Sequence, residues 1–142
     1  MGLDMVLAAT RKGKEASDAT IYWRKANAIH GWFVKNLQQG IDDCRTYPVD
    51  LNQLRQLVST CLKVRAAWQA AVDFSNDEDV YINDVLRDIV GDLLPPTEGF
   101  FFGSSDIDAD YMYDVQFTAD RLTEILSHPD VEDYEFTYIG WW

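Results

Sequence analysis

The position of the β-prone segments most constrains the fold of this chain, because they lie near its two ends. The apolar run Leu3–Ala9 and the β-branched and aromatic run Thr20–Trp23 precede every helical pattern, with Arg11–Ser17 as the connecting loop. Tyr134–Ile139 follows the last helical pattern and shows the alternation of a strand. Strands from both ends of a chain pair most simply in one antiparallel sheet. The sequence therefore predicts an α+β fold, in which a small antiparallel sheet packs against about four helices.

Four segments between these strands carry apolar residues at the spacing of an α-helix. They run from Arg24 to about Gln39, from the N-cap Asp50 to about residue 73, over residues 78–93, and over Ile107–Leu126. Gln53 follows Asp50 by three residues, which is the pattern of a capping box. We expect Asp42–Pro48 to form a loop and Phe100–Ser105 to form a strand or an extended segment. The length of 142 residues fits a single compact domain, residues 1–142.

The composition argues against several classes of function. Hydrophobic residues make up 47% of the chain, which is typical of a folded protein rather than a disordered one. A net charge of −12 argues against direct binding to nucleic acid or to an anionic membrane surface, since both attract positive charge. No apolar stretch approaches the roughly 18 residues of a transmembrane helix, and the N-terminal residues lack the charge order of a signal peptide. We therefore expect a cytoplasmic protein that does not bind membranes.

The few cysteines and histidines give no catalytic or metal-binding signature. Cys44 and Cys61 are too few for a disulfide framework, and we expect both to be free thiols. His30 and His128 do not stand at zinc-ligand spacing from them. His30 falls on the apolar face of its predicted helix, which favours a hydrogen-bonded histidine of the core. A pair of His30 with either cysteine stays open, although no local signature supports it.

The run Asp106–Asp110 alternates carboxylates as a calcium-binding loop does, but the residues that follow it argue against such a loop. Its sixth position needs glycine and holds Tyr111, and its twelfth needs glutamate and holds Phe117. We expect Asp106 or Asp108 to cap the long helix instead. The glycines nearby lack the lysine of a phosphate loop, and no dinucleotide-binding pattern is present. The sequence therefore predicts no metal and no cofactor.

The negative charge is distributed unevenly along the chain. Residues 1–71 hold ten basic and six acidic side chains, whereas residues 72–142 hold two basic and eighteen acidic ones. Six aspartates of the second half repeat every four residues on two predicted helices and form a candidate partner-binding face: Asp84, Asp88, Asp92, Asp106, Asp110 and Asp114. At that spacing the carboxylates lie about 6 Å apart, close to the spacing of phosphates along one DNA strand. Such an acidic face fits a partner protein with a basic surface.

The segment Tyr22–Phe33 is rich in aromatic residues and in side chains that form hydrogen bonds. One interpretation is structural, a strand-to-helix junction anchored by half-buried tryptophans. The other is a ligand site, because tryptophan, tyrosine and arginine dominate binding surfaces. The candidate residues of that site come from this segment and from a turn at Phe102-Gly103-Ser104: Trp23, Arg24, Lys25, Asn27, His30 and Ser104.

Three segments stand out together: Gly2–Met5, Tyr22–Phe33 and Leu94–Ser104, the last followed by an Asp…Tyr…Asp helix start. In these segments the chain resembles a family of small acidic proteins from bacteriophages and prophages. The family has no established activity, so the resemblance implies a context and no mechanism. Small phage proteins of this size often bind and block a host enzyme, including restriction and CRISPR effectors.

These observations favour a phage-encoded acidic protein that binds a basic surface of a host protein. It would inhibit a nucleic-acid-handling or defence protein of the CRISPR or restriction type in the host cytoplasm, by nucleic-acid mimicry. The alternative is a small enzyme or ligand-binding protein whose site lies at the junction residues and the Ser104 turn. The lack of a recognisable nucleophile favours binding over catalysis. A third hypothesis is a homodimer, which would bury Trp141 and Trp142 or join the basic half of one copy to the acidic half of another.

Overall fold

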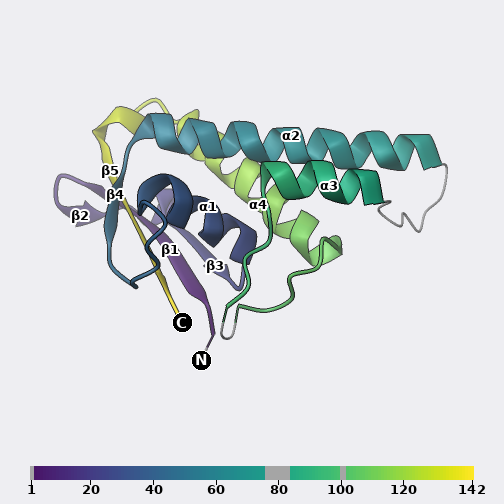
Figure 1. Ribbon diagram of the computed structural model, residues 1–142. Coiled ribbons are helices and arrows are strands. Elements are labelled where there is room, and N and C mark those ends of the chain that lie inside the picture. Colours follow the sequence, from purple (N-terminus) through teal and green to yellow (C-terminus); the bar gives the residue numbers. More distant parts are fainter. Residues whose placement is uncertain (1, 76–83, 100–101) are drawn as a thin grey trace.

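A five-stranded antiparallel sheet and four helices make up the described part of the chain, which confirms the predicted α+β class (Figure 1). The structure is a computed structural model, and it describes residues 2–75, 84–99 and 102–142. The strands are β1 (Asp4–Arg11), β2 (Lys14–Glu15), β3 (Ile21–Arg24), β4 (Tyr47–Val49) and β5 (Tyr134–Trp141). The helices are α1 (Asn27–Leu37), α2 (Leu51–Ser75), α3 (Asp84–Leu93) and α4 (Ala109–Leu126).

Strand β1 is at the centre of the sheet because it pairs along both of its edges. The C-terminal strand β5 pairs with all eight residues of β1, so the two ends of the chain lie together, as predicted. On its other edge β1 pairs with β3 through its first residues and with β2 through its last ones. Lys12 and Gly13 have φ angles of 53° and 77°, and two successive positive φ angles form the tight turn of the β1–β2 hairpin.

Two predicted loops contain short strands. The loop predicted over Arg11–Ser17 includes β2, and the loop predicted over Asp42–Pro48 runs into β4, which pairs with the outer edge of β5. Pro48 has no backbone N–H to donate, so it suits an edge strand such as this one. Because β2 has two residues and β4 has three, neither is long enough to show a clear alternation in the sequence.

The start of α1 differs from the prediction because of the backbone before it. The helix begins at Asn27 rather than at Arg24, since Arg24 completes β3 and Lys25 has a φ angle of 56°, outside the range of a right-handed helix. The predicted third helix is confirmed over residues 84–93 as α3, and its earlier part, residues 78–83, lies outside the described residues.

The two predicted helix caps are confirmed. The backbone N–H of Gln53 donates to the side chain of Asp50 at 2.7 Å, and the backbone N–H of Asp50 donates to the side chain of Gln53 at 2.9 Å. Of the two residues predicted to cap the long helix, Asp108 does so by accepting from the backbone N–H of Tyr111 at 3.0 Å. α4 therefore begins at the residue after it.

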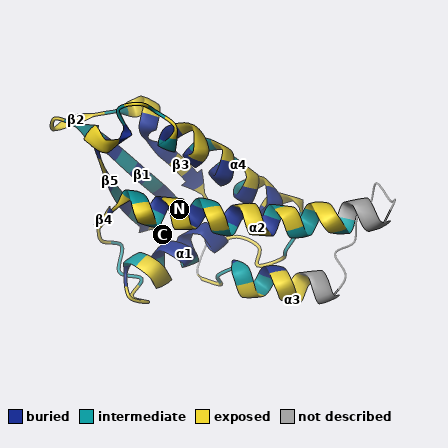
Figure 2. Cartoon of the chain, turned by 90° about the horizontal axis from the view of Figure 1, so that it is seen from above, coloured by how far each residue is buried: buried dark blue, intermediate teal, exposed yellow. Residues whose placement is uncertain are grey.

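The helices cover one face of the sheet. Met5 and Leu7 of β1 and Tyr138 of β5 are fully or almost fully buried on that face, whereas the alternate residues Val6 and Ile139 keep part of their surface exposed. α2 crosses the molecule, with the sheet below its first half and α3 below its second half (Figure 1). Buried residues alternate with more exposed ones along β1, β3 and β5, and they gather in α1 (Figure 2). None of the helices in the described residues has the length and hydropathy of a membrane span.

Candidate functional site

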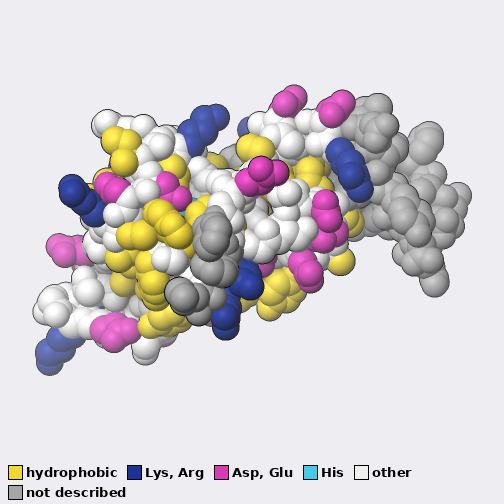
Figure 3. All heavy atoms as spheres, turned by 60° about the horizontal axis from the view of Figure 1, so that its bottom comes forward, with side chains coloured by type: hydrophobic (Ala, Val, Ile, Leu, Met, Phe, Trp, Pro, Cys, Tyr) yellow, Lys and Arg dark blue, Asp and Glu magenta, His cyan; other side chains and the backbone are white. Residues whose placement is uncertain are grey.

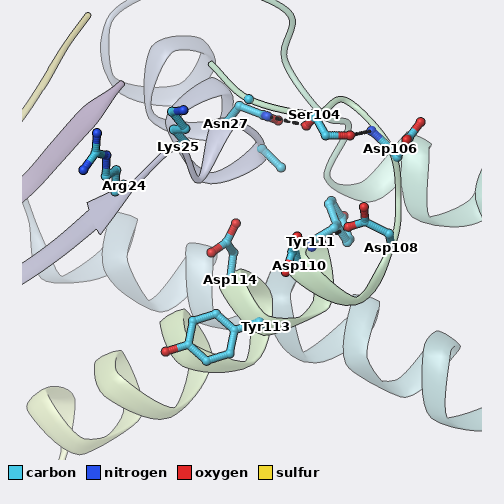
Figure 4. Close-up of a pocket in the computed structure, with 12 residues that line it drawn as sticks. Arg24, Lys25, Asn27, Ser104, Asp106, Asp108, Asp110, Tyr111, Tyr113 and Asp114 are labelled. Atoms are coloured by element: carbon cyan, nitrogen blue, oxygen red, sulfur yellow. Dashed lines mark hydrogen bonds between the residues drawn. The ribbon is translucent and has the colours of Figure 1, made fainter. Parts of the chain in front are cut away.

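A cavity of about 360 Å³ lies between the β3–α1 junction and the segment that leads into α4 (Figure 4). One wall comes from Arg24, Lys25 and Asn27, and the other comes from Gly103, Ser104 and the first two turns of α4. Segments far apart in the sequence therefore meet at one site. Cavities that bind small molecules measure roughly 300–1,000 Å³, so this one is large enough for a small metabolite.

Arg24 and Lys25 form the basic wall of the cavity, and both side chains are exposed. Lys25 has a left-handed backbone, which is held in place where its N–H donates to the carbonyl of Leu3 at 2.7 Å. Gly103 approaches it closely, because a Cβ atom at Gly103 would lie 3.3 Å from the Cβ atom of Lys25. The φ angle of Gly103 is 85°, a conformation that favours glycine. The basic wall and the Gly103 turn are thus packed against each other.

Asn27 holds the two walls together. Its buried side-chain amide donates to the carbonyls of Phe102 and Ser104, at 3.1 and 2.8 Å. Its side-chain oxygen accepts from the backbone N–H of Thr97 at 3.0 Å. Asn27 therefore builds the cavity, because its amide is already used within the protein. Residues 102–105 form no strand: the side chain of Asn27, not a neighbouring strand, binds the carbonyls of Phe102 and Ser104, and Gly103 has a left-handed backbone. Phe100 and Phe101 of that predicted segment lie outside the described residues.

Four aspartates form the acidic wall: Asp106, Asp108, Asp110 and Asp114. Asp110 and Asp114 extend from successive turns of α4, and Figure 4 shows the carboxylate of Asp114 pointing into the space between Asp110 and the basic wall. The pKa of Asp114 is raised to about 6, mainly by burial and then by the neighbouring carboxylates of Asp110 and Asp108. Asp114 therefore changes its charge close to neutral pH.

The opposite charges of the two walls do not pair with each other. In the described residues, the ion pairs between a basic side chain and a carboxylate, histidine aside, use Arg11, Arg45, Arg65 and Arg121. None of these four arginines lines the cavity. Arg24 and Lys25 therefore line the same cavity as Asp110 and Asp114 without an ion pair to either of them.

The structure brings four of the six predicted ligand-site residues to this cavity: Arg24, Lys25, Asn27 and Ser104. Trp23 lies outside it, because successive strand residues point to opposite faces. Trp23 is buried, and its indole N–H donates to the hydroxyl of Thr118 at 2.9 Å.

His30 also lies outside the cavity, in the core between α1 and the sheet. It is completely buried, with Nδ1 bonded to the hydroxyl of Tyr138 and Nε2 bonded to the carboxylate of Asp42 at 3.0 Å. This confirms the predicted hydrogen-bonded core histidine. Both ring nitrogens are used, so neither is left for a cysteine. Cys44 and Cys61 are free thiols, and burial raises the pKa of Cys61 to about 12, which makes it a poor nucleophile.

The predicted acidic face is divided between two environments. Asp88 and Asp92 are exposed on α3, and Asp106 and Asp110 are exposed at the rim of the cavity, whereas Asp114 is half-buried inside it. Asp84 is the first residue of α3, and its side chain lies outside the described part. Figure 3 shows acidic side chains spread over both halves of the face that it presents, with basic side chains among them.

The basic N-terminal half of the chain does not form a separate surface. Arg65 of α2 pairs with Asp120 of α4 at 3.2 Å, and Arg11 of β1 lies 3.4 Å from both Asp130 and Asp133. The fold therefore places part of the basic half directly against the acidic half.

Two tyrosines that line the cavity were not among the predicted site residues. Tyr111 is buried, and its hydroxyl donates to the carbonyl of Leu94 at 2.6 Å, which ties the start of α4 to the end of α3. Tyr113 is exposed beside the cavity. Both tyrosines lie within one helical turn of Asp110 in the sequence, and this spacing could have indicated that they belong to the site.

No protein family, curated protein or solved structure was found to match this chain. Among the described residues, no three histidine, cysteine, aspartate or glutamate side chains are grouped so that they could hold a metal ion. Trp141 and Trp142, the residues of the predicted dimer interface, are each 41% exposed, and the dimer stays a prediction.

Proposed function

We propose that this protein binds a small charged ligand in the cavity between Arg24, Lys25 and the start of α4. The observation that carries the proposal is the presence of opposite charges on facing walls without an ion pair between them. Burial raises the pKa of Asp114, and repulsion by the neighbouring carboxylates of Asp110 and Asp108 raises it further. Such perturbed carboxylates in a cleft are typical of functional sites.

Each wall supplies a different kind of contact. Arg24 offers the planar fork of N–H groups that suits carboxylates and phosphates, and Lys25 offers a compact single charge. Asp110 and Asp114 offer acceptors for a cation or a hydrogen-bond donor. Asn27 is a positioning residue, because it holds the walls together and leaves recognition to the charged side chains.

A ligand screen followed by amide chemical shifts in NMR spectra tests the proposal. A library of small metabolites is added to the isotope-labelled protein, and we expect binders to shift the amides of Ser104, Tyr111 and Asp114. The variants Arg24→Gln and Asp114→Asn should weaken that response, whereas Asp88→Asn should not, since Asp88 is exposed on α3 outside the cavity. No binder in the whole library, or binders that the cavity variants leave unaffected, would count against the proposal.

The resemblance and the charge favour a second candidate function, an acidic phage protein that inhibits a host nucleic-acid-handling or defence protein in the cytoplasm. One specific observation supports it. Asp88 and Asp92 on α3, with Asp106 and Asp110 at the cavity rim, are exposed and take part in none of the ion pairs of the described residues. Exposed carboxylates without partners are available to the basic groove of a protein that normally binds phosphates.

Competition with DNA tests this second candidate. The immobilised protein is exposed to a bacterial lysate, and captured proteins are then displaced with double-stranded DNA. A variant with Asn at positions 88, 92, 106 and 110 should lose the DNA-displaceable proteins. A control that neutralises four exposed acids elsewhere, Glu15, Asp18, Glu132 and Glu135, should keep them. Capture that DNA does not compete, or that both variants lose equally, would contradict mimicry.

A further inference from the structure

We infer that the ligand of the cavity is a zwitterion, with a carboxylate or phosphate group toward Arg24 and Lys25 and an ammonium group toward Asp110 and Asp114. This inference rests on the proposed ligand-binding function. It follows from the juxtaposition of two cations with the carboxylates of Asp106, Asp110 and Asp114, which form no ion pair within the described residues, along one cavity of about 360 Å³. It names the chemical class of ligand that compensates the charges on both walls at once.

The basic wall provides the anion-binding half of the site. Arg24 and Lys25 are adjacent in sequence, and both line the cavity. Neither forms an ion pair within the described residues. A carboxylate or a phosphate that enters here gains a bidentate partner in the guanidinium and a second charge in the ammonium.

The acidic wall provides the cation-binding half. Asp108 accepts the backbone N–H of Tyr111 and is held at the helix start, so its carboxylate is partly used. Asp110 and Asp114 accept no hydrogen bond through their side chains within the described residues, and Figure 4 shows Asp114 directed into the cavity. An ammonium group placed between them would relieve the repulsion between the two carboxylates.

Singly charged ligands and polyanions fit the same walls less well. A simple anion would compensate the basic wall and leave the carboxylates of Asp110 and Asp114 unpaired. A simple amine would do the reverse and leave Arg24 and Lys25 without a partner. A nucleotide or another polyanion would bring several negative charges beside an acidic wall, which repels them. A zwitterion is the simplest ligand that offers a negative group to the basic wall and a positive group to the acidic wall.

Matched sets of small probes test this inference by NMR titration. The first set contains γ-aminobutyrate, which carries both charges, with butyrate and butylamine, which carry one charge each. The second set contains phosphoethanolamine with ethyl phosphate and ethanolamine, and it distinguishes a phosphate from a carboxylate as the anionic group. We expect the zwitterion of at least one set to bind about tenfold more tightly than either singly charged partner.

Variants assign the two ends of the ligand. Arg24→Gln should weaken the zwitterion and its anionic analogue but leave the amine unchanged. Asp114→Asn should weaken the zwitterion and the amine but leave the anionic analogue unchanged. Asp88→Asn, outside the cavity, should change none of them. Heteronuclear spectra of each variant show whether it is folded before titration.

The outcomes separate this inference from the proposed function. If singly charged probes shift the cavity amides as strongly as the zwitterions do, the zwitterion inference is wrong while ligand binding stands. If both variants weaken all three probes of a set equally, the two-ended arrangement is also wrong. If no probe of either set shifts the cavity amides, the zwitterion inference fails, and the metabolite library then decides the proposed function separately.

Discussion

Replacing Asp114 by asparagine is expected to stabilise the protein at neutral pH. The pKa of Asp114 is raised from 3.8 to about 6, first by burial and then by Asp110 and Asp108. A raised pKa means that the charged carboxylate is less favourable in the folded protein than in the unfolded chain. The wild-type protein therefore loses stability as the pH rises from 3.8 through about 6, and the loss is complete above that window. Asparagine does not titrate, so the variant avoids this loss.

The pKa difference sets an upper limit on the gain in stability. A change from 3.8 to about 6 corresponds to roughly 3 kcal/mol in the free energy of unfolding. Asp114 keeps part of its surface in water, which screens its charge, so we expect about 1 kcal/mol. In a domain of this size that gain raises Tm by about 3 °C at neutral pH. Below the unfolded-state pKa of 3.8 the gain disappears, because the carboxyl group is then protonated in both states.

The difference in the free energy of unfolding is measured by urea denaturation of the wild-type protein and the variant. The measurement is repeated at a series of pH values from 3.8, through about 6, to neutral pH. Asp88→Asn is the matched control, because it removes one charge from an acidic protein at an exposed site outside the cavity. We expect the difference for Asp114→Asn to grow as the pH rises through about 6 and the difference for the control to stay constant. A difference that is equal at every pH, or a variant that is less stable than the wild type at neutral pH, would refute the reasoning.

Asn27→Ala should lower the free energy of unfolding by about 2–4 kcal/mol, because it leaves one buried and two partly buried backbone groups without their partner. A loss below about 1 kcal/mol in urea denaturation would contradict its positioning role. Trp23→Phe should cost about 1–2 kcal/mol by removing the bond to Thr118, with ligand binding intact. A Trp23→Phe variant with an unchanged free energy of unfolding but without ligand binding would show instead that Trp23 belongs to the ligand site. In a Cys44→Ser variant the remaining thiol, Cys61, should not react with Ellman's reagent until urea unfolds the chain, and fast reaction of the folded protein would show that it is accessible.

The fold was predictable where its elements are long and their pattern is regular. The apolar run of β1, the alternation of β5 and the helical spacing of α2 and α4 extend over many residues, so local sequence was enough to find them. β2 and β4 were missed because they are formed by pairing with longer strands and have almost no pattern of their own. The start of α1 was placed too early because the left-handed backbone of Lys25 depends on its hydrogen bond to Leu3, a contact between distant residues.

The sequence alone could have shown which candidate site residues belong to the core. Trp23 and Arg24 are neighbours in a strand, so one had to face the core and the other the solvent. His30 lies on the apolar face of α1, which already favoured a place in the core. The place of Asp114 beside the predicted ligand-site residues was not predictable, because the contacts of Asn27 with a distant loop bring the two segments together. No local pattern records such a contact.

The charge pattern shows why composition and spacing gave an incomplete account of this protein. The aspartates of α3 and those of α4 repeat at the same interval, yet Asp88 lies in solvent and Asp114 lies in a cavity opposite Arg24. Other acids of the same half are neutralised by arginines from the opposite half, as Asp120 is by Arg65. The proposed function rests on charges that stay unpaired after folding. Basic and acidic side chains of this kind line one cavity, and a ligand that spans both walls is the simplest way to compensate them.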